Sequence, residues 1–383
     1  MVKVGVPRET GAGERRVALV PSSLGMLSKA GVDVVMEAGA GLTAGFHDDE
    51  YEERGATVSR DASEVFAAAV VLRVDGSNDV ERLREGSVLI GLCRPLALPE
   101  ASRSLAQRGV TAFALELMPR ISRAQVMDAL SSQASIAGYK AVLLAAASLP
   151  KMFPMMSTAA GTIAPARVLV LGAGVAGLQA IATARRLGAV VQSYDVRPAV
   201  KEQVESLGAK FVELGIHAEG GGGYAGELDE ASSQRQRELL GEVVAASDAV
   251  ISTALVPGSK APLLIGAEAV RRMDPGSVII DLAAEQGGNC ELTKPDEVVT
   301  EGEVTILGPT NLPATVPYHA SQTYSRNVSS FLTHLLSEGE LRIDLEDEIT
   351  RETLVARDGE VVHERVRERL SKGAVEAVAA SAR

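Results

Sequence analysis

The chain has 383 residues, of which 46% are hydrophobic, and a formal net charge of −12. This length and apolar content predict two globular domains, each able to bury a core. The acidic balance argues against a nucleic-acid partner or an anionic membrane surface, because both require an excess of Lys and Arg. The two cysteines, Cys93 and Cys290, show no disulfide or metal-ligand spacing, which favours a reducing compartment and hence the cytoplasm.

The sequence predicts no direct membrane insertion. Residues 3–6 have the pattern of a strand rather than of a signal peptide, and no uncharged apolar run reaches the ~18 to 20 residues that a spanning helix needs. If the protein serves a membrane process, we expect another polypeptide to supply the membrane part.

The first 115 residues alternate β-rich runs with helical patterns, which is typical of an α/β domain. A long helix rich in small residues is predicted over residues 128–149 and would connect this domain to the next. The strands are expected at residues 3–6, 32–37, 70–74, 87–92 and 111–115, with a helix over 22–30.

A second α/β series begins at Arg167 and predicts six strands in a doubly wound order. These strands are expected at residues 167–171, 190–194, 210–213, 249–253, 277–282 and 304–307. A helical run through residues 331–336 would then return the chain to the first domain, where Asp358-Gly359 signals a β-hairpin. The fold class is therefore α/β with two Rossmann-like domains: 1–127 with 312–383, and an inserted domain over 128–311.

A glycine-rich turn lies between the first strand and the first helix of the second series. Gly172, Gly174 and Gly177 have the G-x-G-x-x-G spacing of a dinucleotide site. Gly172 allows the tight turn, Gly174 lets the backbone approach a pyrophosphate, and Gly177 lets the helix pack on the strand. The next strand ends in Asp195, whose carboxylate would accept from ribose hydroxyls and repel a 2′-phosphate. NAD is therefore favoured over NADP, although Arg197 could accommodate that phosphate.

Two further segments are candidates for contact with the nucleotide. A run of four glycines precedes Tyr224, and a flexible loop with one aromatic anchor commonly acts as a lid, although a solvated loop has the same composition. Asp281 and Glu285 follow a strand of the second domain. Either these carboxylates touch the ribose or the substrate, or they stabilise a helix N-terminus.

The segment from Met118 to Gln133 joins the two predicted domains and should face the cleft. It places Arg120, Gln125, Asp128 and Ser131 in a short loop and the first helical turn. These polar side chains could orient a carboxamide ring through hydrogen bonds. Helix capping or an interdomain salt bridge is the alternative.

Together, Arg120 to Gln133, the turn from Gly172 to Gly177, Asp195-Val196-Arg197 and the Gly-Gly-Tyr-Ala sequence around Tyr224 resemble one known family. This is the NAD(H)-binding domain I, the soluble part of the alpha subunit, of proton-translocating NAD(P) transhydrogenase. The resemblance covers nearly the whole chain. The family is related to alanine dehydrogenase, with which it shares the opening motifs at residues 4–9 and 15–21.

The substrate positions separate the two relatives. Alanine dehydrogenases carry a Lys in the third-strand segment and a His after the following strand, whereas residues 71–75 and 89–94 contain neither. Oxidising an amine or alcohol requires a proton acceptor, and none of the five histidines stands in such a context. Hydride transfer between two nicotinamides needs only that the rings be held close. The alternatives are an alanine-dehydrogenase-like amino-acid oxidoreductase, a saccharopine-dehydrogenase-like activity, and a catalytically silent NAD-binding subunit.

The resemblance implies specific residue roles. Arg120, Gln125, Asp128 and Ser131 would surround the nicotinamide and its ribose and so serve the hydride transfer. No metal ligands are implied. The residues that would bind NAD(H) are Arg120, Ser122, Gln125, Asp128, Ser131, Gly172, Ala173, Gly174, Val175, Gly177, Asp195, Val196, Arg197, Gly223, Tyr224, Gln236 and Leu255.

The resemblance also implies partners. The subunit would form a homodimer and dock an NADP(H)-binding domain that belongs to a membrane-spanning transhydrogenase subunit. That partner would carry NADP(H) and couple hydride transfer to proton translocation. The chain itself would be cytoplasmic and peripheral at the inner face of the cell membrane.

Overall fold

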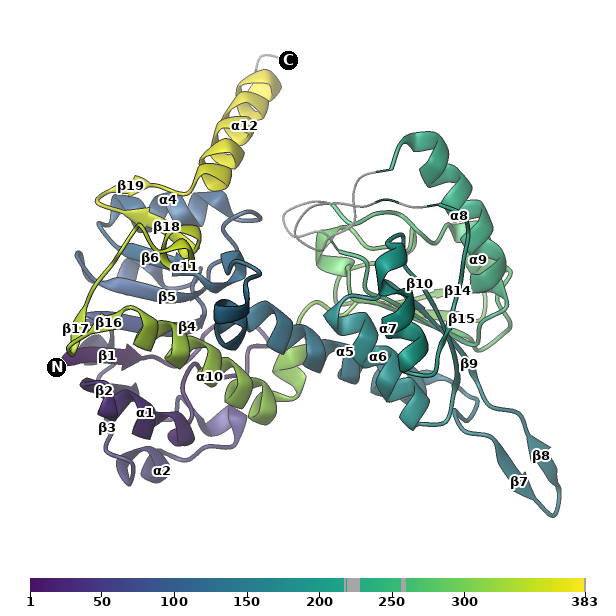
Figure 1. The fold of residues 1–383 in the computed structure, drawn as a ribbon, viewed down its shortest axis with the longest axis horizontal. Helices are drawn as coiled ribbons and strands as arrows, with labels where there is room; N and C mark the ends of the chain where they lie inside the picture. The colour runs from purple at the N-terminus through teal and green to yellow at the C-terminus, as the bar shows by residue number, and fades with distance from the viewer. Residues whose placement is uncertain (217, 219–227, 256–259, 382–383) are drawn as a thin grey trace. The chain divides into compact units, whose positions relative to one another are not determined.

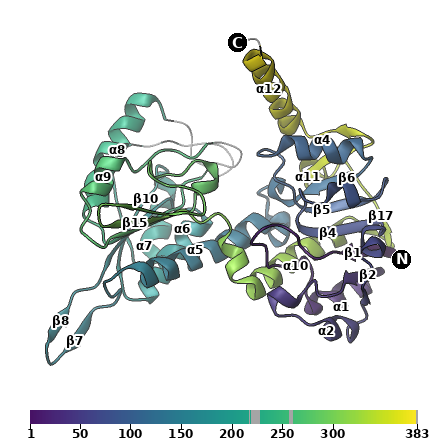
Figure 2. The same cartoon turned by 180° about the vertical axis from the view of Figure 1, so that it is seen from behind.

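The computed structural model describes residues 1–216, 218, 228–255 and 260–381. Its internal contacts divide the chain into two compact units. Unit 1 comprises Met1–Gln133 and Ala314–Arg383, and unit 2 comprises Ala134–Pro313. The domain boundaries expected from the sequence, 127/128 and 311/312, remain a prediction. Figures 1 and 2 show the helices and strands of each unit from two opposite sides.

Among its described residues, unit 1 is built on an eight-stranded sheet with the order β19-β18-β6-β5-β4-β1-β2-β3. Strands β1 to β6 pair in parallel, and β18 joins β6 in antiparallel orientation. The strands are β1 Val2–Val6, β2 Val32–Glu37, β3 Thr57–Ser59, β4 Val70–Asp75, β5 Val88–Leu92, β6 Thr111–Ala114, β18 Leu354–Arg357 and β19 Glu360–Val361.

The predicted hairpin near the C-terminus is confirmed. Asp358 and Gly359 have φ angles of 52° and 83°, the left-handed conformations that a two-residue hairpin turn requires. They connect β18 and β19, which pair in antiparallel orientation. Because β18 also pairs with β6, the C-terminal segment completes the sheet that the N-terminal segment begins.

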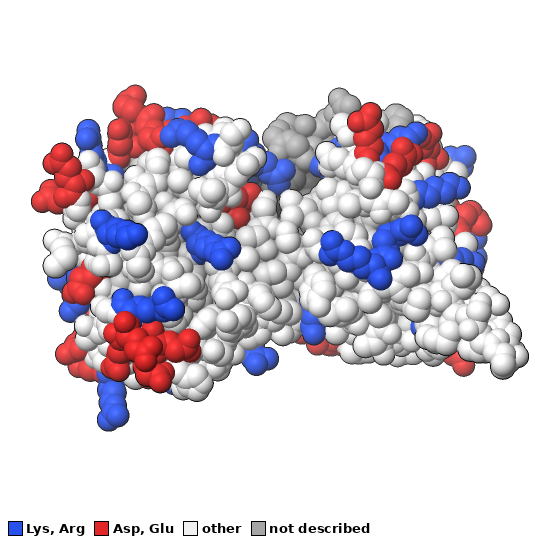
Figure 3. Space-filling view, turned by 60° about the horizontal axis from the view of Figure 1, so that its bottom comes forward, with Lys and Arg blue, Asp and Glu red and all other residues white. Residues whose placement is uncertain are grey.

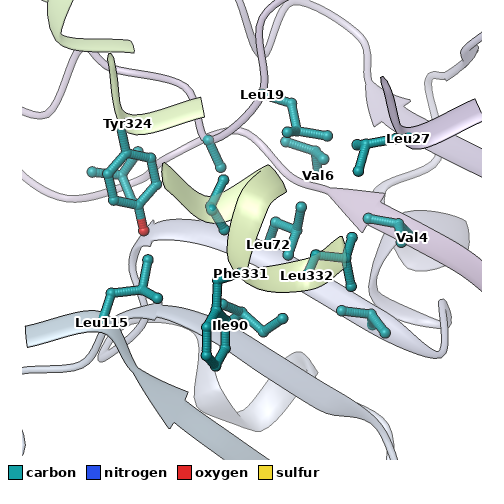
Figure 4. Packing of buried hydrophobic residues seen from close by; sticks show 14 of the residues in the cluster. Val4, Val6, Leu19, Leu27, Leu72, Ile90, Leu115, Tyr324, Phe331 and Leu332 are labelled. Carbon is teal, nitrogen blue, oxygen red and sulfur yellow. The ribbon is translucent and has the colours of Figure 1, made fainter. Parts of the chain in front are cut away.

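Helix α10, Pro317–His334, packs its apolar side against this sheet. Figure 4 shows Tyr324, Phe331 and Leu332 of this helix among sheet residues such as Leu72 and Ile90. The other helices of unit 1 are α1 Leu24–Lys29, α2 Asp48–Glu52, α3 Ala62–Phe66, α4 Pro99–Gln107, α11 Glu348–Thr353 and α12 Glu364–Ser381. Its shorter elements are η1 Pro21–Ser23, η2 Leu42–Ala44, η3 Val80–Arg82, η4 Leu115–Leu117, η5 Ser122–Met127, β16 Leu336–Ser337 and β17 Glu340–Leu341.

The described part of unit 2 contains a seven-stranded sheet with the order β11-β10-β9-β12-β13-β15-β14. Apart from β14, which is antiparallel, this is the doubly wound order 3-2-1-4-5-6 that the sequence predicts. The Rossmann-like fold class is thus confirmed. The strands are β9 Arg167–Leu171, β10 Val190–Tyr194, β11 Lys210–Phe211, β12 Ala249–Ser252, β13 Val278–Asp281, β14 Val298–Glu301 and β15 Val304–Leu307.

Both faces of this sheet are covered, as is usual for parallel sheets. Val168 and Val170 point into a core with the α6 residue Ile181, whereas Leu169 and Leu171 point into a second core with the α8 residue Leu240. The helices are α5 Ala129–Ser148, which begins in unit 1, α6 Val175–Arg186, α7 Lys201–Ser206, α8 Glu230–Ala245 and α9 Ala267–Arg271. Shorter helical turns are η6 Pro198–Val200, η8 Ala284–Gln286 and η9 Leu312–Thr315, which ends in unit 1.

A two-stranded hairpin extends from unit 2 (Figure 1). The sequence predicted no strand at these residues. Its strands are β7, Met156–Thr158, and β8, Gly161–Ile163, and they pair with each other. The side chains of Met155, Met156 and Ile163 are 64%, 37% and 45% exposed.

No helix in the described part of the chain combines the length and the apolar character that crossing a membrane demands. On the face drawn in Figure 3, the described basic side chains are scattered among acidic and uncharged ones.

Candidate functional site

The glycine-rich turn of unit 2 connects β9 to α6, as predicted. Gly172 has a φ of 92°, and a Cβ atom there would lie 2.7 Å from Oγ1 of Thr253. A Cβ atom at Gly177 would collide with the carbonyl oxygen of Gly172, so helix and turn approach too closely for a side chain. A Cβ atom at Gly174 would meet no described atom within 4 Å. The turn is therefore closed toward the sheet and open on the side where a ligand would approach.

Helix α6 begins directly after this turn. Gly174 is its N-cap residue and has no side chain to cap the helix, while Val175 at the first helical position is 39% exposed. The N–H groups of a first turn without a side-chain cap, together with the helix dipole, favour an anion. The turn thus has the local geometry of a pyrophosphate-binding site.

Asp195 follows β10 at the same edge of the sheet, but its carboxylate is turned toward the chain's own donors. One oxygen accepts from the main-chain nitrogen of Ala173 at 2.7 Å and from Nη2 of Arg197 at 2.7 Å. The other accepts from Nε and the main-chain nitrogen of Arg197, at 2.8 and 2.9 Å. Asp195 in turn raises the pKa of Arg197. Arg197 was the residue that could accommodate a 2′-phosphate. Its guanidinium is hydrogen-bonded to Asp195 instead. Val196 lies between the two residues in the chain.

The remaining unit 2 candidates lie in different surroundings. Gln236, on α8, is 3% exposed, and its Nε2 donates to Oη of Tyr194 at 2.9 Å, one residue before Asp195. Leu255 is half-buried in the segment after β12. Gly223 and Tyr224 lie outside the described residues.

Asp281 holds a turn and is fully buried. Its carboxylate accepts from the main-chain nitrogens of Ala283, Asn289 and Cys290 and from Oγ1 of Thr293, at 2.8 to 3.0 Å. Burial raises the pKa of Asp281, although these hydrogen bonds oppose the rise. The carboxylate of Asp281 is therefore occupied by main-chain and hydroxyl donors of this turn. Asn289 was missed because no local pattern marks it.

The candidate loop of unit 1 is anchored by apolar residues and presents polar ones. Ala124 and Met127 are buried, whereas Arg120, Ser122 and Gln125 are exposed. Most of the loop is the 3-10 helix η5, which ends immediately before Asp128. The buried anchors fix the loop, and its polar groups lie at the surface.

Asp128 stands at the start of α5, where it acts as a helix cap. Its Oδ1 accepts from the main-chain nitrogen of Ser131 at 2.9 Å, and its Oδ2 accepts from Oγ of Ser131 at 2.6 Å. The structure thus brings Asp128 and Ser131 together, and the capping role considered as an alternative is present. Asn327 of α10 supports the loop, because its Nδ2 donates to the carbonyl oxygen of Val126 at 2.9 Å.

Arg73 and Cys93 lie in the two segments where an amino-acid dehydrogenase is expected to carry its Lys and His, and both side chains are buried. Arg73 is fully buried, and its guanidinium donates to Glu9 at 3.0 Å and to Asp79 at 2.9 Å. Cys93 is 1% exposed, and burial raises the pKa of its thiol well above the usual value. Neither side chain is suited to accept a proton from a substrate. Within the described ranges, no group of three or more His, Cys, Asp or Glu side chains could hold a metal ion.

Comparison with known proteins identifies the family. The model "Alanine dehydrogenase/PNT, N-terminal domain" matches residues 5–137, and the model of the C-terminal domain matches residues 141–364. The first portion of the NAD(P) transhydrogenase subunit alpha of Rhodospirillum rubrum is 46% identical over 376 residues, which cover 94% of this chain and 98% of that protein.

Two further relatives support this assignment. A crystal structure of transhydrogenase from Sinorhizobium meliloti has 43% identity and a TM-score of 0.83, and the match covers 94% of this chain and 99% of that one. Alanine dehydrogenase of Bacillus subtilis is 28% identical, with 95% and 93% of the two chains covered. The chain therefore belongs to the alanine dehydrogenase/PNT family, within which it is a homologue of the transhydrogenase alpha subunits.

Proposed function

We propose that this protein binds NAD(H) and exchanges a hydride directly with NADP(H) held by a partner domain. The observation that carries the proposal is the glycine-rich turn of unit 2, open at Gly174 and followed by Asp195, in a homologue of transhydrogenase alpha subunits. A catalytically silent NAD-binding subunit would have the same turn, so turnover must decide between the two.

The residues of unit 2 would bind the dinucleotide. The N-terminus of α6 would receive the pyrophosphate, and Asp195 would accept from the adenosine ribose in place of one of its hydrogen bonds from Arg197, so that the ion pair persists. The proposed contacts are Gly172, Ala173, Gly174, Val175, Gly177, Asp195, Val196, Arg197, Gly223, Tyr224, Gln236 and Leu255.

The loop of unit 1 would orient the nicotinamide. Arg120, Ser122 and Gln125 offer exposed polar groups, and Asp128 with Ser131 forms a fixed pair at the start of α5. Such groups can hold a carboxamide ring without exchanging protons with it. Because a hydride moving between two nicotinamides leaves no proton to remove, orientation and proximity supply the catalysis. Arg73 and Cys93 are buried and unsuited to accept a proton, which agrees with a reaction that needs no proton acceptor.

The same proposal includes partners. An NADP(H)-binding domain attached to a membrane-spanning transhydrogenase subunit would supply NADP(H) and the coupling to proton translocation. This partner would place the chain at the inner face of the cell membrane. The relatives are named as an alpha subunit, or as one portion of it, which supports such a division of labour.

We also propose a homodimer, formed through the β7–β8 hairpin. Residues 152–166 carry no charged side chain, and an isolated two-stranded hairpin is marginally stable in water. The exposed side chains of Met155, Met156 and Ile163 therefore need an apolar surface to cover them. A second copy of the chain meets that need in a closed, symmetric assembly.

Light scattering on size-exclusion fractions tests the dimer. The unaltered chain should have twice the mass of one chain, and the double variant Met155→Asp with Ile163→Asp should have the mass of one. Val298→Asp, on the exposed edge strand β14, is the matched control and should stay dimeric. A monomeric unaltered chain, or a control that dissociates equally, would refute the interface.

An assay with both nucleotides tests the activity. The chain is mixed with a transhydrogenase NADP(H)-binding domain, and reduction of an NADP⁺ analogue by NADH is followed spectroscopically. We expect transfer in the mixture and none with either component alone. L-alanine is offered to the chain with NAD⁺ in parallel, and NADH formation there would support the amino-acid oxidoreductase instead.

A further inference from the structure

Asn289 lies in the turn after β13 and is fully buried at the carboxyl edge of the unit 2 sheet. Its Oδ1 accepts from Oγ of Ser252 at 2.7 Å and from the main-chain nitrogen of Ala254 at 3.1 Å. Its Nδ2 donates to the carbonyl oxygens of Ala254 and Pro262, at 2.9 and 2.8 Å. A primary amide has two acceptor sites and two donor hydrogens. The described contacts of Asn289 therefore use its full hydrogen-bonding capacity.

Asp281 fixes the turn that carries Asn289. Oδ2 of this carboxylate accepts from the main-chain nitrogens of Asn289 and Cys290, at 2.8 and 3.0 Å. Gly288 has a φ of 78°, and a Cβ atom there would lie 3.0 Å from the same oxygen. The chain wraps closely around the carboxylate, which leaves Asn289 little freedom to move.

The segment held by Asn289 forms one wall of the glycine-rich turn. Oγ1 of Thr253 donates to the carbonyl oxygens of Leu171 and Gly172, both at 3.1 Å. A Cβ atom at Gly172 would lie 3.1 Å from the main-chain nitrogen of Ala254, the atom that Asn289 also binds. The amide of Asn289 is thus one residue removed from direct contact with the turn.

We propose that Asn289 is a positioning residue of the NAD(H) site, which holds the main chain of Ala254 at the spacing from Gly172 that the dinucleotide requires. This inference rests on the proposed function, because it takes the turn from Gly172 to Gly177 as the nucleotide site. The hydrogen bonds of Asn289 join loops at the carboxyl edge, where ligands of doubly wound sheets bind.

Calorimetric titration of the full chain with NADH tests this role. Asn289→Asp keeps the side chain's size but removes the two donated hydrogen bonds, so the carbonyl oxygens of Ala254 and Pro262 lose a partner. We expect the Kd for NADH to rise ~10-fold or more, with an unchanged number of sites per folded chain. Asn289→Ser, which introduces no charge, should shift the Kd in the same direction.

The number of sites separates positioning from folding, because loss of folded protein lowers that number and leaves the Kd of the remainder unchanged. The matched control is Asp248→Asn at the opposite, amino edge, where Asp248 accepts from the main-chain nitrogen of Arg167 at 2.7 Å. The control should lower the Tm and keep the Kd within about twofold, because no described residue hydrogen-bonds to both Asp248 and Asn289.

Three results would overturn the inference: Asn289 variants that bind with the unaltered Kd, a loss of sites at the unaltered Kd, or an equal rise of Kd in the Asp248 control. An unaltered chain that does not bind NADH would refute the proposed function itself, and this inference with it.

Discussion

Asp195 and Arg197 form an ion pair at the position that distinguishes NAD from NADP in Rossmann domains. A carboxylate there accepts from ribose hydroxyls, whereas a free arginine attracts a 2′-phosphate. In this protein the arginine is held by the carboxylate at 2.7 and 2.8 Å, so its charge is already compensated. We therefore expect the pair as a whole to favour NAD, with a preference that depends on both members.

Asp195→Asn should reverse this preference. The amide can still accept from Ala173 but holds Arg197 less strongly, which frees the guanidinium for a 2′-phosphate. Titration calorimetry should show NADPH binding ~10-fold tighter and NADH binding weaker than in the unaltered chain. Arg197→Gln, which keeps the carboxylate and removes the cation, should bind NADPH no better. Equal NADPH affinity in Asp195→Asn and the unaltered chain would contradict this account.

Asp128 combines a structural contact with a proposed role in orienting the nicotinamide, and substitution can separate the two. Asn caps helices about as well as Asp, so Asp128→Asn should keep the free energy of unfolding, whereas Asp128→Ala should lose ~1 kcal/mol. Both variants should slow hydride transfer in the mixed assay ~10-fold or more, because neither presents a charged carboxylate, with much smaller changes in NADH affinity. Equal losses of transfer and affinity would count against the placement of this loop.

At the scale of elements, the starts of β9 and β12 are held together by a charged cluster. Asp248, just before β12, accepts from Arg167 at the start of β9 and from Nζ of Lys151 at 2.7 Å. Burial alone would raise the pKa of Asp248, but the hydrogen bonds from Arg167 and Lys151 outweigh it and lower the pKa to about 2. A carboxylate with a lowered pKa stabilises the fold only while it is ionised.

The stability supplied by Asp248 should therefore depend on pH in a defined range. It is fully present above the unfolded-state pKa of ~4 and is lost as the pH falls toward the folded-state value of about 2. Asp248→Asn should lower the free energy of unfolding at pH 7 by roughly 1 to 2 kcal/mol, allowing for the exposed partners, and flatten the decline between pH 4 and 2. Urea unfolding across that range measures both. An unchanged acid slope in the variant would show that other carboxylates dominate.

The elements that the sequence predicts well are those with strong local signals. Runs of β-branched residues identified the parallel strands, and the alternation of six such runs with helical segments predicted the order of the second sheet. β3 was missed because its three residues, Thr57–Ser59, are too few to reveal a period. β14 was missed because it is a partly exposed edge strand, Val298–Glu301, and β7 and β8 because their side chains alternate with no buried face.

The arrangement within the candidate site was less predictable than the fold. The sequence located Asp195 and Arg197 but left open whether the arginine faces a ligand or its neighbour. Asn289 contacts Ala254 across 35 residues of chain, and Arg73 contacts Glu9 across 64. No local periodicity encodes such contacts, because they depend on which loops each sheet brings together at its own edge.

At the scale of the whole molecule, both units contain a sheet of the same doubly wound order, but the residues beside the switch point differ between the two sheets. In unit 2 the switch lies between β9 and β12, beside the glycine-rich turn. In unit 1 it lies between β1 and β4, where the nearly buried side chains of Glu9 and Arg73 form an ion pair. Tyr324 of α10 covers the same region by donating to the carbonyl oxygen of Arg73 at 2.6 Å. This asymmetry supports the proposal that the pyrophosphate binds to unit 2, while the loop of unit 1 keeps its proposed role in orienting the nicotinamide.

The fate of the hydrogen on C4 of NADH tests the central claim most directly. NADH deuterated at the transferred position is mixed with the chain, a transhydrogenase NADP(H)-binding domain and NADP⁺, and the NADPH formed is analysed by mass spectrometry. Direct transfer predicts that NADPH carries the deuterium, that none enters water, and that no NADPH forms without the partner domain. Deuterium lost to solvent, or oxidation of L-alanine by the chain alone, would contradict the account.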